Sequence, residues 1–210
     1  MGFAADADVS GPFSGRLIFV RHGETDWNVE GRLQGDRDVP LNAKGRDQAH
    51  AVGRFLRANY ALDLARMNAA GRTFCSPLSR ARETMTICRN ELEFPGDAVL
   101  NADLREVSFG DWEGLTWPDI KVLHPIAYQA RERDSWGYRP ANGESFVDVV
   151  KRLAGFLGAI SGDCFVVAHG GVARTLLALI GGVPTSAAFS ATIHQGRALI
   201  FQAGGYEWRG

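Results

Sequence analysis

Two histidines, each placed just after an apolar run, are the residues of this chain best suited to chemistry. His22 follows the run Leu17–Val20 and Arg21, and His169 follows the run Cys164–Ala168. Such short β-branched and aromatic runs predict buried strands, and the glycine after each histidine predicts the turn that leaves the strand. Ligand-binding groups in α/β sheets lie at the carboxyl ends of the strands. Two parallel neighbouring strands would therefore bring both imidazoles to one edge of the sheet.

The chemistry that these residues suggest is attack on a phosphoryl group. A neutral imidazole is a suitable nucleophile for phosphorus, and the reaction needs donors around the non-bridging oxygens. We interpret His22 as the nucleophile and Arg21 as a planar donor beside it. Arg80 follows another short strand candidate and supplies a second guanidinium, while His169 and the backbone N–H near Gly170 add further donors.

A proton donor and an amide complete the predicted site. Glu106 lies beside apolar residues in a turn-rich segment, where burial or the incoming phosphate would favour its protonated form. The same carboxylate could then activate water against a phosphohistidine. Asn28 lies close enough in sequence to His22 to fix the geometry of the pocket. Three other carboxylates compete with Glu106 for the role of acid: Asp103, Glu113 and Glu24.

Strands that alternate with helices must position these groups. Strands are predicted at residues 17–20, 73–76, 164–168 and 198–201, and helices at 43–56, 78–88, 118–132, 146–157 and 171–180. Asn42 is a candidate N-cap, and Ser145 with Asp148 resembles a capping box. This alternation predicts an α/β fold, a three-layer α/β/α sandwich with a mostly parallel sheet.

The length and composition fit one globular domain. The chain has 210 residues, 45% of them hydrophobic, and contains no linker long enough to divide it. We therefore expect a single domain over residues 16–210, after a flexible leader over residues 1–15. Residues 111–143, which contain several Trp, Tyr and Arg residues, are expected to form a lid over the site.

Charge and cysteine content narrow the class of protein. With 23 basic and 24 acidic residues, the chain gives no reason to expect binding to nucleic acid or to an anionic membrane. Cys75, Cys88 and Cys164 have no zinc-binding spacing and predict core thiols in a reducing compartment. The N-terminus lacks the pattern of a secretory signal, and the apolar region 164–183 is interrupted by His169 and several glycines. We expect a cytoplasmic protein.

Four ordered motifs resemble those of the histidine phosphatase superfamily, in its phosphoglycerate-mutase-like branch. They are Arg21-His22-Gly23-Glu24-Thr25-Asp26-Trp27-Asn28, Leu33-Gln34-Gly35-Asp36, Ser76 to Thr84 with Arg80-Ala81 inside it, and Ala168-His169-Gly170-Gly171. The resemblance implies that His22 is phosphorylated and that Glu106 is the proton donor. It implies a phosphate pocket formed by Arg21, Arg80 and His169. Gln34 and Gly35 would belong to a substrate-side loop, although they also fit a simple turn.

The segment around Glu106 separates two activities within this branch. Cofactor-dependent mutases are similar there but carry Glu-Arg-His-Tyr-Gly and a longer insertion. This chain has Glu106-Val107-Ser108-Phe109-Gly110, which resembles the broad-specificity and ribazole-phosphatase members. A mutase must keep water from its phosphohistidine, and the shorter chain offers less lid for that purpose. The segment therefore favours a phosphatase.

The predicted function is hydrolysis of small phosphomonoesters, without metal or cofactor, through a phosphohistidine on His22. Two alternatives stay open: a cofactor-dependent phosphoglycerate mutase, and a catalytically silent module that binds phosphorylated ligands. A metallohydrolase is disfavoured, because carboxylates at metal-ligand spacing are missing from the sequence. The expected partner is a phosphorylated small molecule. Trp117 and Trp136 are candidates either for the lid or for the interface of a homodimer.

Overall fold

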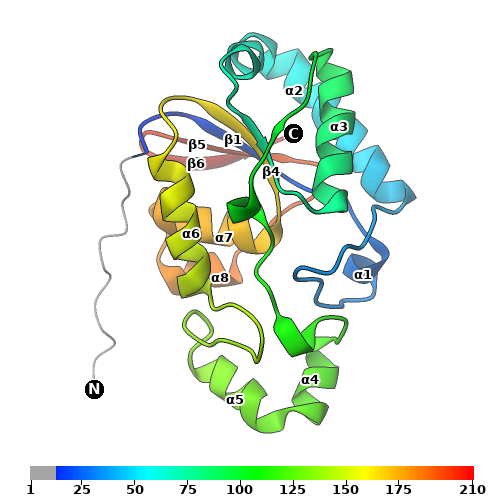
Figure 1. Ribbon diagram of the computed structural model, residues 1–210, viewed down its shortest axis with the longest axis vertical. Helices are drawn as coiled ribbons and strands as arrows, with labels where there is room; N and C mark the ends of the chain where they lie inside the picture. Colours follow the sequence, from blue (N-terminus) through cyan, green and yellow to red (C-terminus); the bar gives the residue numbers. More distant parts are fainter. Residues whose placement is uncertain (1–12) are drawn as a thin grey trace.

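A single six-stranded sheet forms the centre of the structure, a computed structural model that describes residues 13–210 (Figure 1). The strands run in the order β3-β2-β4-β1-β5-β6. Their bounds are Leu17–Arg21 (β1), Thr73–Cys75 (β2), Val99–Leu100 (β3), Cys164–Ala168 (β4), Ala198–Gln202 (β5) and Gly205–Arg209 (β6). β1, β2, β3 and β4 are mutually parallel, whereas β5 is antiparallel to both of its neighbours. The predicted mostly parallel sheet is confirmed.

Helices cover both faces of this sheet, so that alternate residues of each central strand enter different cores (Figure 1). Leu17 and Phe19 of β1 pack toward α6, α7 and α8, whereas Ile18 and Val20 pack toward α2 and α3. A strand that is buried on both faces has to be apolar throughout, which explains its uninterrupted hydrophobic run. The helices of these layers are α2 (Ala43–Ala69), α3 (Ser79–Leu92), α6 (Phe146–Gly158), α7 (Gly170–Leu179) and α8 (Thr185–Ser190).

The two predicted helix caps form as expected. The Asn42 side chain accepts a hydrogen bond from the Gly45 amide at 2.8 Å and starts α2. Ser145 and Asp148 form a reciprocal capping box at the start of α6. These side chains satisfy amide groups that the first turn of a helix leaves without partners.

Some elements differ from the prediction in extent or number. The helix expected at 118–132 is two helices, α4 (Trp117–Leu123) and α5 (Pro125–Arg133), because Pro125 cannot continue the hydrogen-bonding pattern of α4. The helix that begins after Asn42 runs to Ala69, with a kink at Tyr60. The strands β3 and β6, the helix α8 and three short elements were not predicted. The short elements are α1 (Asp26–Val29), η1 (Ala102–Leu104) and η2 (Gly110–Trp112).

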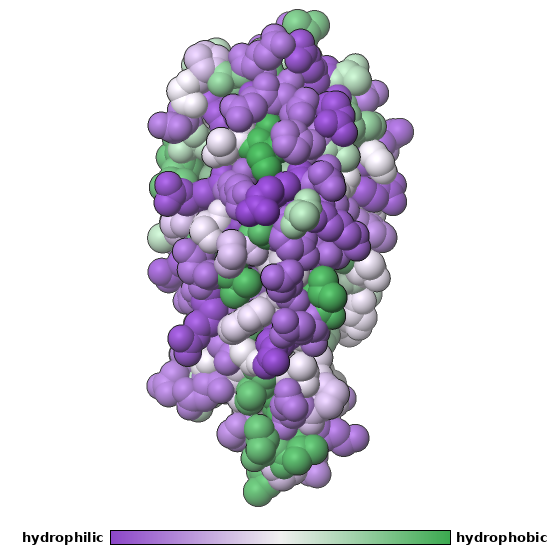
Figure 2. Space-filling model, turned by 90° about the vertical axis from the view of Figure 1, so that its right-hand side faces the viewer, coloured by the Kyte–Doolittle hydropathy of each residue, from purple (hydrophilic) through white to green (hydrophobic). Residues whose placement is uncertain are grey.

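Residues 111–143 lie at one end of the molecule, beyond the carboxyl edge of the sheet, with α4 and α5 at the tip (Figure 1). Figure 2 shows apolar surface gathered at that tip, where Val122, Leu123 and Ile126 are exposed. This segment is joined to the loop after α1, because the Leu33 amide donates to the Leu115 carbonyl at 2.9 Å. We call residues 111–143 the lid segment.

The start of the described chain packs against the core, and the three cysteines are buried. The leader expected at residues 1–15 falls mainly on residues 1–12, which lie outside the described part of the chain; Phe13 packs against the core formed with α6 and α7. Cys75, Cys88 and Cys164 are buried free thiols. No helix within residues 13–210 is both long enough and apolar enough to cross a membrane.

Candidate active site

The sheet brings His22 and His169 together, as the two strand ends predict. β1 and β4 are parallel neighbours, and their paired positions end at Arg21 and Ala168. The two imidazole rings follow directly, with centroids 5.1 Å apart. Both side chains are buried. One sheet edge thus holds two histidines that are far apart in the sequence.

The hydrogen bonds of His22 determine which of its nitrogens faces the cavity. Nδ1 lies 2.7 Å from the carbonyl oxygen of Gly23, which can only accept a hydrogen bond. Nδ1 therefore carries the proton, and Nε2 keeps a free lone pair. Burial, assisted by the positive charges of Arg21 and Arg80, lowers the pKa of His22 well below its usual value. The imidazole stays neutral, as a nucleophile must.

His169 lies next to His22 but is not among the residues that line the cavity. Its Nε2 lies 2.7 Å from the Ser76 hydroxyl. Its Nδ1 is buried without a hydrogen-bond partner among residues 13–210. Burial, followed by the positive charge of Arg80, lowers the pKa of His169 well below its usual value.

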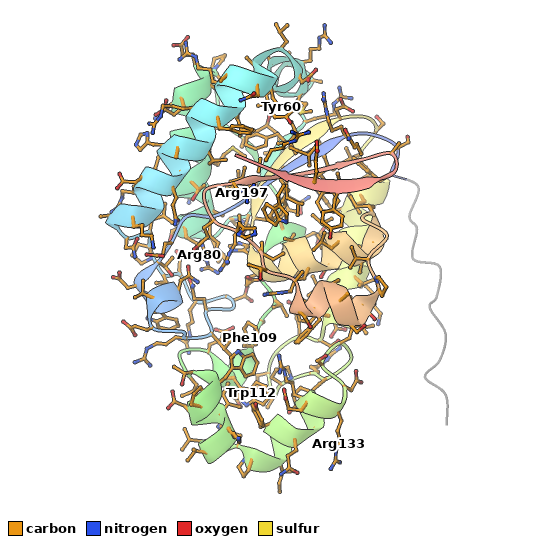
Figure 3. The ribbon with its side chains drawn as sticks, turned by 180° about the vertical axis from the view of Figure 1, so that it is seen from behind. Tyr60, Arg80, Phe109, Trp112, Arg133 and Arg197 are labelled. Atoms are coloured by element: carbon orange, nitrogen blue, oxygen red, sulfur yellow. The ribbon has the colours of Figure 1, made fainter. Side chains whose placement is uncertain are left out.

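Arg21 and Arg80 bring buried guanidinium groups to the same cavity (Figure 3 labels Arg80). Arg80 donates from Nη1 to the Arg37 carbonyl and from Nη2 to the Gly35 carbonyl, at 2.7 and 2.8 Å. Arg21 donates from Nη1 to the Ile193 carbonyl at 2.9 Å. Burial lowers the pKa of Arg21 to about 10 and also lowers that of Arg80. Within the described residues, neither guanidinium has a carboxylate within salt-bridge distance, and both Nε atoms are buried without a partner.

Glu106 lines the cavity opposite these cations. Its Oε1 accepts hydrogen bonds from the amides of Gly171 and Val107, at 2.8 and 2.9 Å. The backbone carbonyl of Glu106 accepts a hydrogen bond from Arg152, which also forms a salt bridge with Glu144. The carboxylate is thereby held in one orientation. Its second oxygen, Oε2, accepts no hydrogen bond from the described residues.

The three competing carboxylates have other partners or positions. Glu24 pairs with Lys44 at 2.9 Å. Glu113 Oε1 accepts from the Asp36 and Phe109 amides, at 3.0 and 3.2 Å. None of Asp103, Glu113 and Glu24 lines the cavity that contains His22.

The predicted substrate-binding residues also lie around this cavity. Asn28, Gln34, Gly35 and Gly170 all line it. The Asn28 Oδ1 accepts from the Thr25 amide, which leaves Nδ2 as a free donor. Gly35 lies in a turn with Asp36 and has a φ of +52°. Its carbonyl accepts a hydrogen bond from Arg80, so this turn is also part of the cavity wall. The cavity has a volume of about 150 Å³.

Three further residues near the site were not among the predicted site residues: Arg174, Gln195 and, except as a competing acid, Glu113. Arg174 lines the cavity from α7, one turn after Gly170, and that spacing was the available signal. Glu113 joins the Gly35–Asp36 turn to the lid segment. Gln195, which lies before β5, donates a hydrogen bond to the Asn28 Oδ1 at 3.0 Å.

Two glycines allow the His22 loop to lie against α2. A Cβ on Gly23 would lie 2.1 Å from the Gly45 carbonyl oxygen, and a Cβ on Gly45 would lie 2.1 Å from that of Glu24. The backbones therefore touch at a distance that no other residue type permits. The Gly23 amide donates to the Thr84 hydroxyl at 3.0 Å, which ties this loop to α3 as well.

Comparison with known proteins agrees with this geometry. The family described as "Histidine phosphatase superfamily (branch 1)" matches residues 17–209. The chain belongs to this superfamily. As a branch 1 histidine phosphatase it has the fold, the motif order and the enzyme class that the sequence resemblance implied.

Individual relatives of this histidine phosphatase include both phosphatases and mutases. It is 31% identical over 186 residues to the adenosylcobalamin/alpha-ribazole phosphatase of Escherichia coli K12, covering 86% of each chain. It is 30% identical over 195 residues to the 2,3-bisphosphoglycerate-dependent phosphoglycerate mutase of Beijerinckia indica, covering 89% of this chain and 90% of the other. The crystal structure of the alpha-ribazole phosphatase from Shigella flexneri superposes with a TM-score of 0.76 and 28% identity, covering 92% and 94% of the chains.

Proposed function

We propose that this histidine phosphatase hydrolyses small phosphomonoesters through a phosphohistidine on His22, with Glu106 as general acid and base. The observation that carries the proposal is the hydrogen bond from Nδ1 of His22 to Gly23, which presents an unprotonated Nε2 to the cavity. Arg21, Arg80 and Arg174 line the same cavity, and none of them has a carboxylate within salt-bridge distance in the described part of the chain. A dianionic phosphate would supply the missing negative charge.

The first half-reaction forms one bond as another breaks. The lone pair of the His22 Nε2 attacks phosphorus, and the bond from phosphorus to the ester oxygen breaks in line with this attack. The leaving alkoxide takes a proton from Glu106. The product alcohol departs and leaves a phosphorus–nitrogen bond on His22.

The second half-reaction returns the enzyme to its starting state. Glu106, now a carboxylate, takes a proton from a water molecule whose oxygen attacks phosphorus, and the bond to Nε2 breaks. Inorganic phosphate leaves, and Glu106 is protonated again. Its fixed position on the Gly171 and Val107 amides supports this double role.

The guanidinium groups stabilise the charge on the transferring phosphoryl group. The buried Nε atoms of Arg21 and Arg80 would gain partners when phosphate enters the cavity. The start of α7 at Gly170 adds the positive end of a helix dipole. In other phosphatases a metal ion stabilises this charge, and here the guanidinium groups do so. We propose that the reaction needs neither metal nor cofactor.

The test is phosphate release in chelator from a panel of alkyl, glycerate and sugar phosphates, by the wild type and by His22→Ala. We expect release by the wild type alone, and acid-labile radiolabel on the wild type after rapid quench. His50→Ala is the matched control, because His50 lies on the surface beside Glu91 at 2.7 Å. Equal release by His22→Ala and the wild type would refute the proposal.

The same panel separates the two rivals. A mutase would interconvert phosphoglycerates when a bisphosphate is added and release little phosphate. A silent module would bind phosphate esters without turnover by any variant. A cytoplasmic location, a homodimer, a lack of nucleic-acid binding and a domain that spans residues 16–210 stay predictions.

A further inference from the structure

A second cavity opens beside the one that contains His22. Its volume is about 330 Å³, at the lower end of the range for small-molecule sites. The two cavities share five lining residues: Leu33, Val107, Phe109, Phe146 and Arg174. A molecule whose phosphate lies against His22 can therefore extend into this second cavity, which we call the lid cavity.

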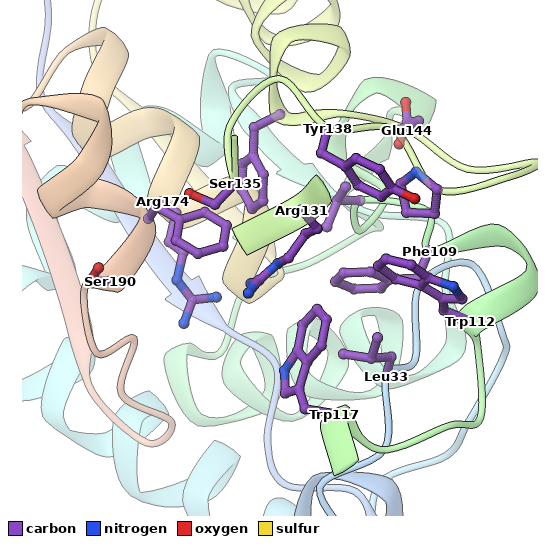
Figure 4. A pocket seen from close by; sticks show the side chains of 14 residues that line it. Leu33, Phe109, Trp112, Trp117, Arg131, Ser135, Tyr138, Glu144, Arg174 and Ser190 are labelled. Atoms are coloured by element: carbon purple, nitrogen blue, oxygen red, sulfur yellow. The ribbon is translucent and has the colours of Figure 1, made fainter. Parts of the chain in front are cut away.

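Six of the 14 residues that line the lid cavity are aromatic. Figure 4 shows Phe109, Trp112, Trp117 and Tyr138 around it. Trp112 and Tyr138 stack with ring centroids 5.5 Å apart and planes 16° apart. Trp117 meets Phe109 edge to face at 6.2 Å. These contacts fix the rings before any ligand arrives.

Arg131 also lines the lid cavity, next to Trp117 and Phe189. Its guanidinium carbon lies 4.1 Å from the ring centroid of Trp117 and 4.8 Å from that of Phe189. Such cation–π contacts hold the lid segment against α8. The Arg131 charge is already paired with Glu132 at 2.5 Å. The wall of the lid cavity is therefore formed before a ligand binds, and the charge of Arg131 is already balanced by Glu132.

Polar groups also line the lid cavity, and its charged side chains have partners within the protein. Glu144 pairs with Arg152 at 3.2 Å and accepts from the Ser108 amide at 3.1 Å. Arg174 donates to the Ala191 carbonyl at 3.3 Å. The hydroxyl groups of Ser135 and Tyr138 can hydrogen-bond to polar substituents of a ligand. The largest surface for stacking comes from six aromatic side chains: Phe109, Trp112, Trp117, Tyr138, Phe146 and Phe189. A flat apolar ring matches it.

We propose that the lid cavity binds an aromatic ring in the organic part of the substrate. The inference rests on the proposed phosphatase function and assigns its substrate class: phosphomonoesters of primary alcohols that carry an aromatic or heteroaromatic ring on a short linker. The ring packs against Phe109 and Trp117 while the phosphate lies against His22. Specificity then comes from residues 109–138 and Phe189 rather than from the phosphate cavity.

The experiment compares substrates that share one kind of leaving group. Phosphates of 2-phenylethanol and 3-phenylpropanol are measured beside their cyclohexyl analogues, the unsubstituted ethyl and propyl phosphates, and glycerol phosphate. All release a primary alkoxide, so differences in kcat/KM report binding of the organic part. We expect the phenyl compounds to exceed the cyclohexyl ones by about 3- to 10-fold, because aromatic pairs gain energy beyond burial alone.

Two variants test whether the lid cavity causes the preference. Trp117→Leu and Phe189→Leu keep an apolar wall from two different elements but remove one ring each. Each should reduce the phenyl-to-cyclohexyl ratio of kcat/KM at least about threefold. Tyr206→Leu is the control, because Tyr206 is an exposed aromatic residue on β6 and lines neither cavity. If one lid variant fails to fold, the other still gives the ratio.

The outcomes separate this inference from the proposed function. Phosphate release with equal rates for phenyl and cyclohexyl compounds, or with preference for glycerol phosphate, would overturn the aromatic subsite and leave the phosphatase intact. A preference for carboxylate-bearing alkyl phosphates would assign the lid cavity to an anion held by Arg131 and would also overturn it. No release from any ester would refute the proposed function itself.

Discussion

The amide of Gly171 donates a hydrogen bond to the Oε1 of Glu106, at 2.8 Å, from the first turn of α7. This contact links the carboxylate to the same helix that follows His169. It is close enough that a Cβ on Gly171 would lie 2.4 Å from that oxygen. The position of the proposed acid therefore depends on a glycine outside its own segment.

Gly171→Ala should displace Glu106 and lower kcat by about 10²-fold or more, the lower end of what general acid–base catalysis contributes. Binding of phosphate should change less, because the guanidinium groups are unaffected. Steady-state kinetics on an alkyl phosphate measure the effect. Gly155→Ala is the matched control, because a Cβ there meets nothing within 4 Å in helix α6. Unchanged kcat in Gly171→Ala would contradict the role assigned to Glu106.

Arg80→Lys should lower kcat/KM by about 10²- to 10³-fold, the usual cost of losing one preorganised donor at a reacting oxyanion. The planar guanidinium of Arg80 donates two hydrogen bonds through its Nη atoms, to the carbonyls of Arg37 and Gly35, and keeps its Nε free. A lysine ammonium cannot reproduce this arrangement of donors. Kinetics with an alkyl phosphate provide the measurement. Arg82→Lys, at an exposed position on the same helix, should retain full activity. Equal losses in both variants would indicate a general effect on α3 instead.

The buried histidines predict a loss of stability in acid. Burial lowers the pKa of His169 well below 6.5, so below that pH the unfolded chain binds a proton that the folded chain does not. The free energy of unfolding must then fall as the pH falls below about 6.5. Urea unfolding at pH 7.5, 6.5 and 5.5 should show this slope in the wild type. In His169→Gln the slope should be shallower by up to about 1.4 kcal/mol per pH unit. A steeper slope in the variant would mean that the imidazole is charged in the native state.

Glu113→Ala should loosen the loop that contains Gly35. The Glu113 carboxylate accepts from the Asp36 amide, the Ser108 hydroxyl and the Phe109 amide, at 3.0, 3.1 and 3.2 Å. Without this carboxylate, the three donors either bind water or have no partner. The free energy of unfolding should then decrease by about 1–3 kcal/mol. We expect KM to rise more than kcat falls, because this loop is proposed to bind the substrate and not to transfer the proton. Urea unfolding tests the predicted loss of stability, and steady-state kinetics test the predicted rise in KM. A fall in kcat with unchanged KM would contradict the role in substrate binding that we give to this loop.

Much of the central sheet and of the proposed phosphate site was predictable from the sequence. Buried strands such as β1 and β4 are apolar throughout, so His22 and His169 stood out as polar residues at their ends. The short-range motif around Arg80 likewise follows a strand and begins a helix. In these segments local sequence pattern and three-dimensional position coincide.

The lid segment was less predictable, because its packing depends on contacts between distant residues. Composition alone does not reveal that Arg131 lies between Trp117 and Phe189, or that Glu113 binds the turn at Asp36. β6 was missed although its residues alternate in type, because the Gly204-Gly205 turn obscured a five-residue strand. Such features depend on tertiary contacts that short windows of sequence do not contain.

The close approach of Gly23 and Gly45 restricts how this protein can be engineered. Replacing glycine by alanine within a helix normally stabilises a protein by about 0.5–1 kcal/mol, so Gly45 in α2 would be an obvious target. Here the added carbon would lie 2.1 Å from the Glu24 carbonyl oxygen and push the His22 loop away from the helix. Libraries for thermostability should therefore exclude both positions. In directed evolution, a substitution that raises the helix propensity at Gly45 would at the same time displace the loop that carries His22.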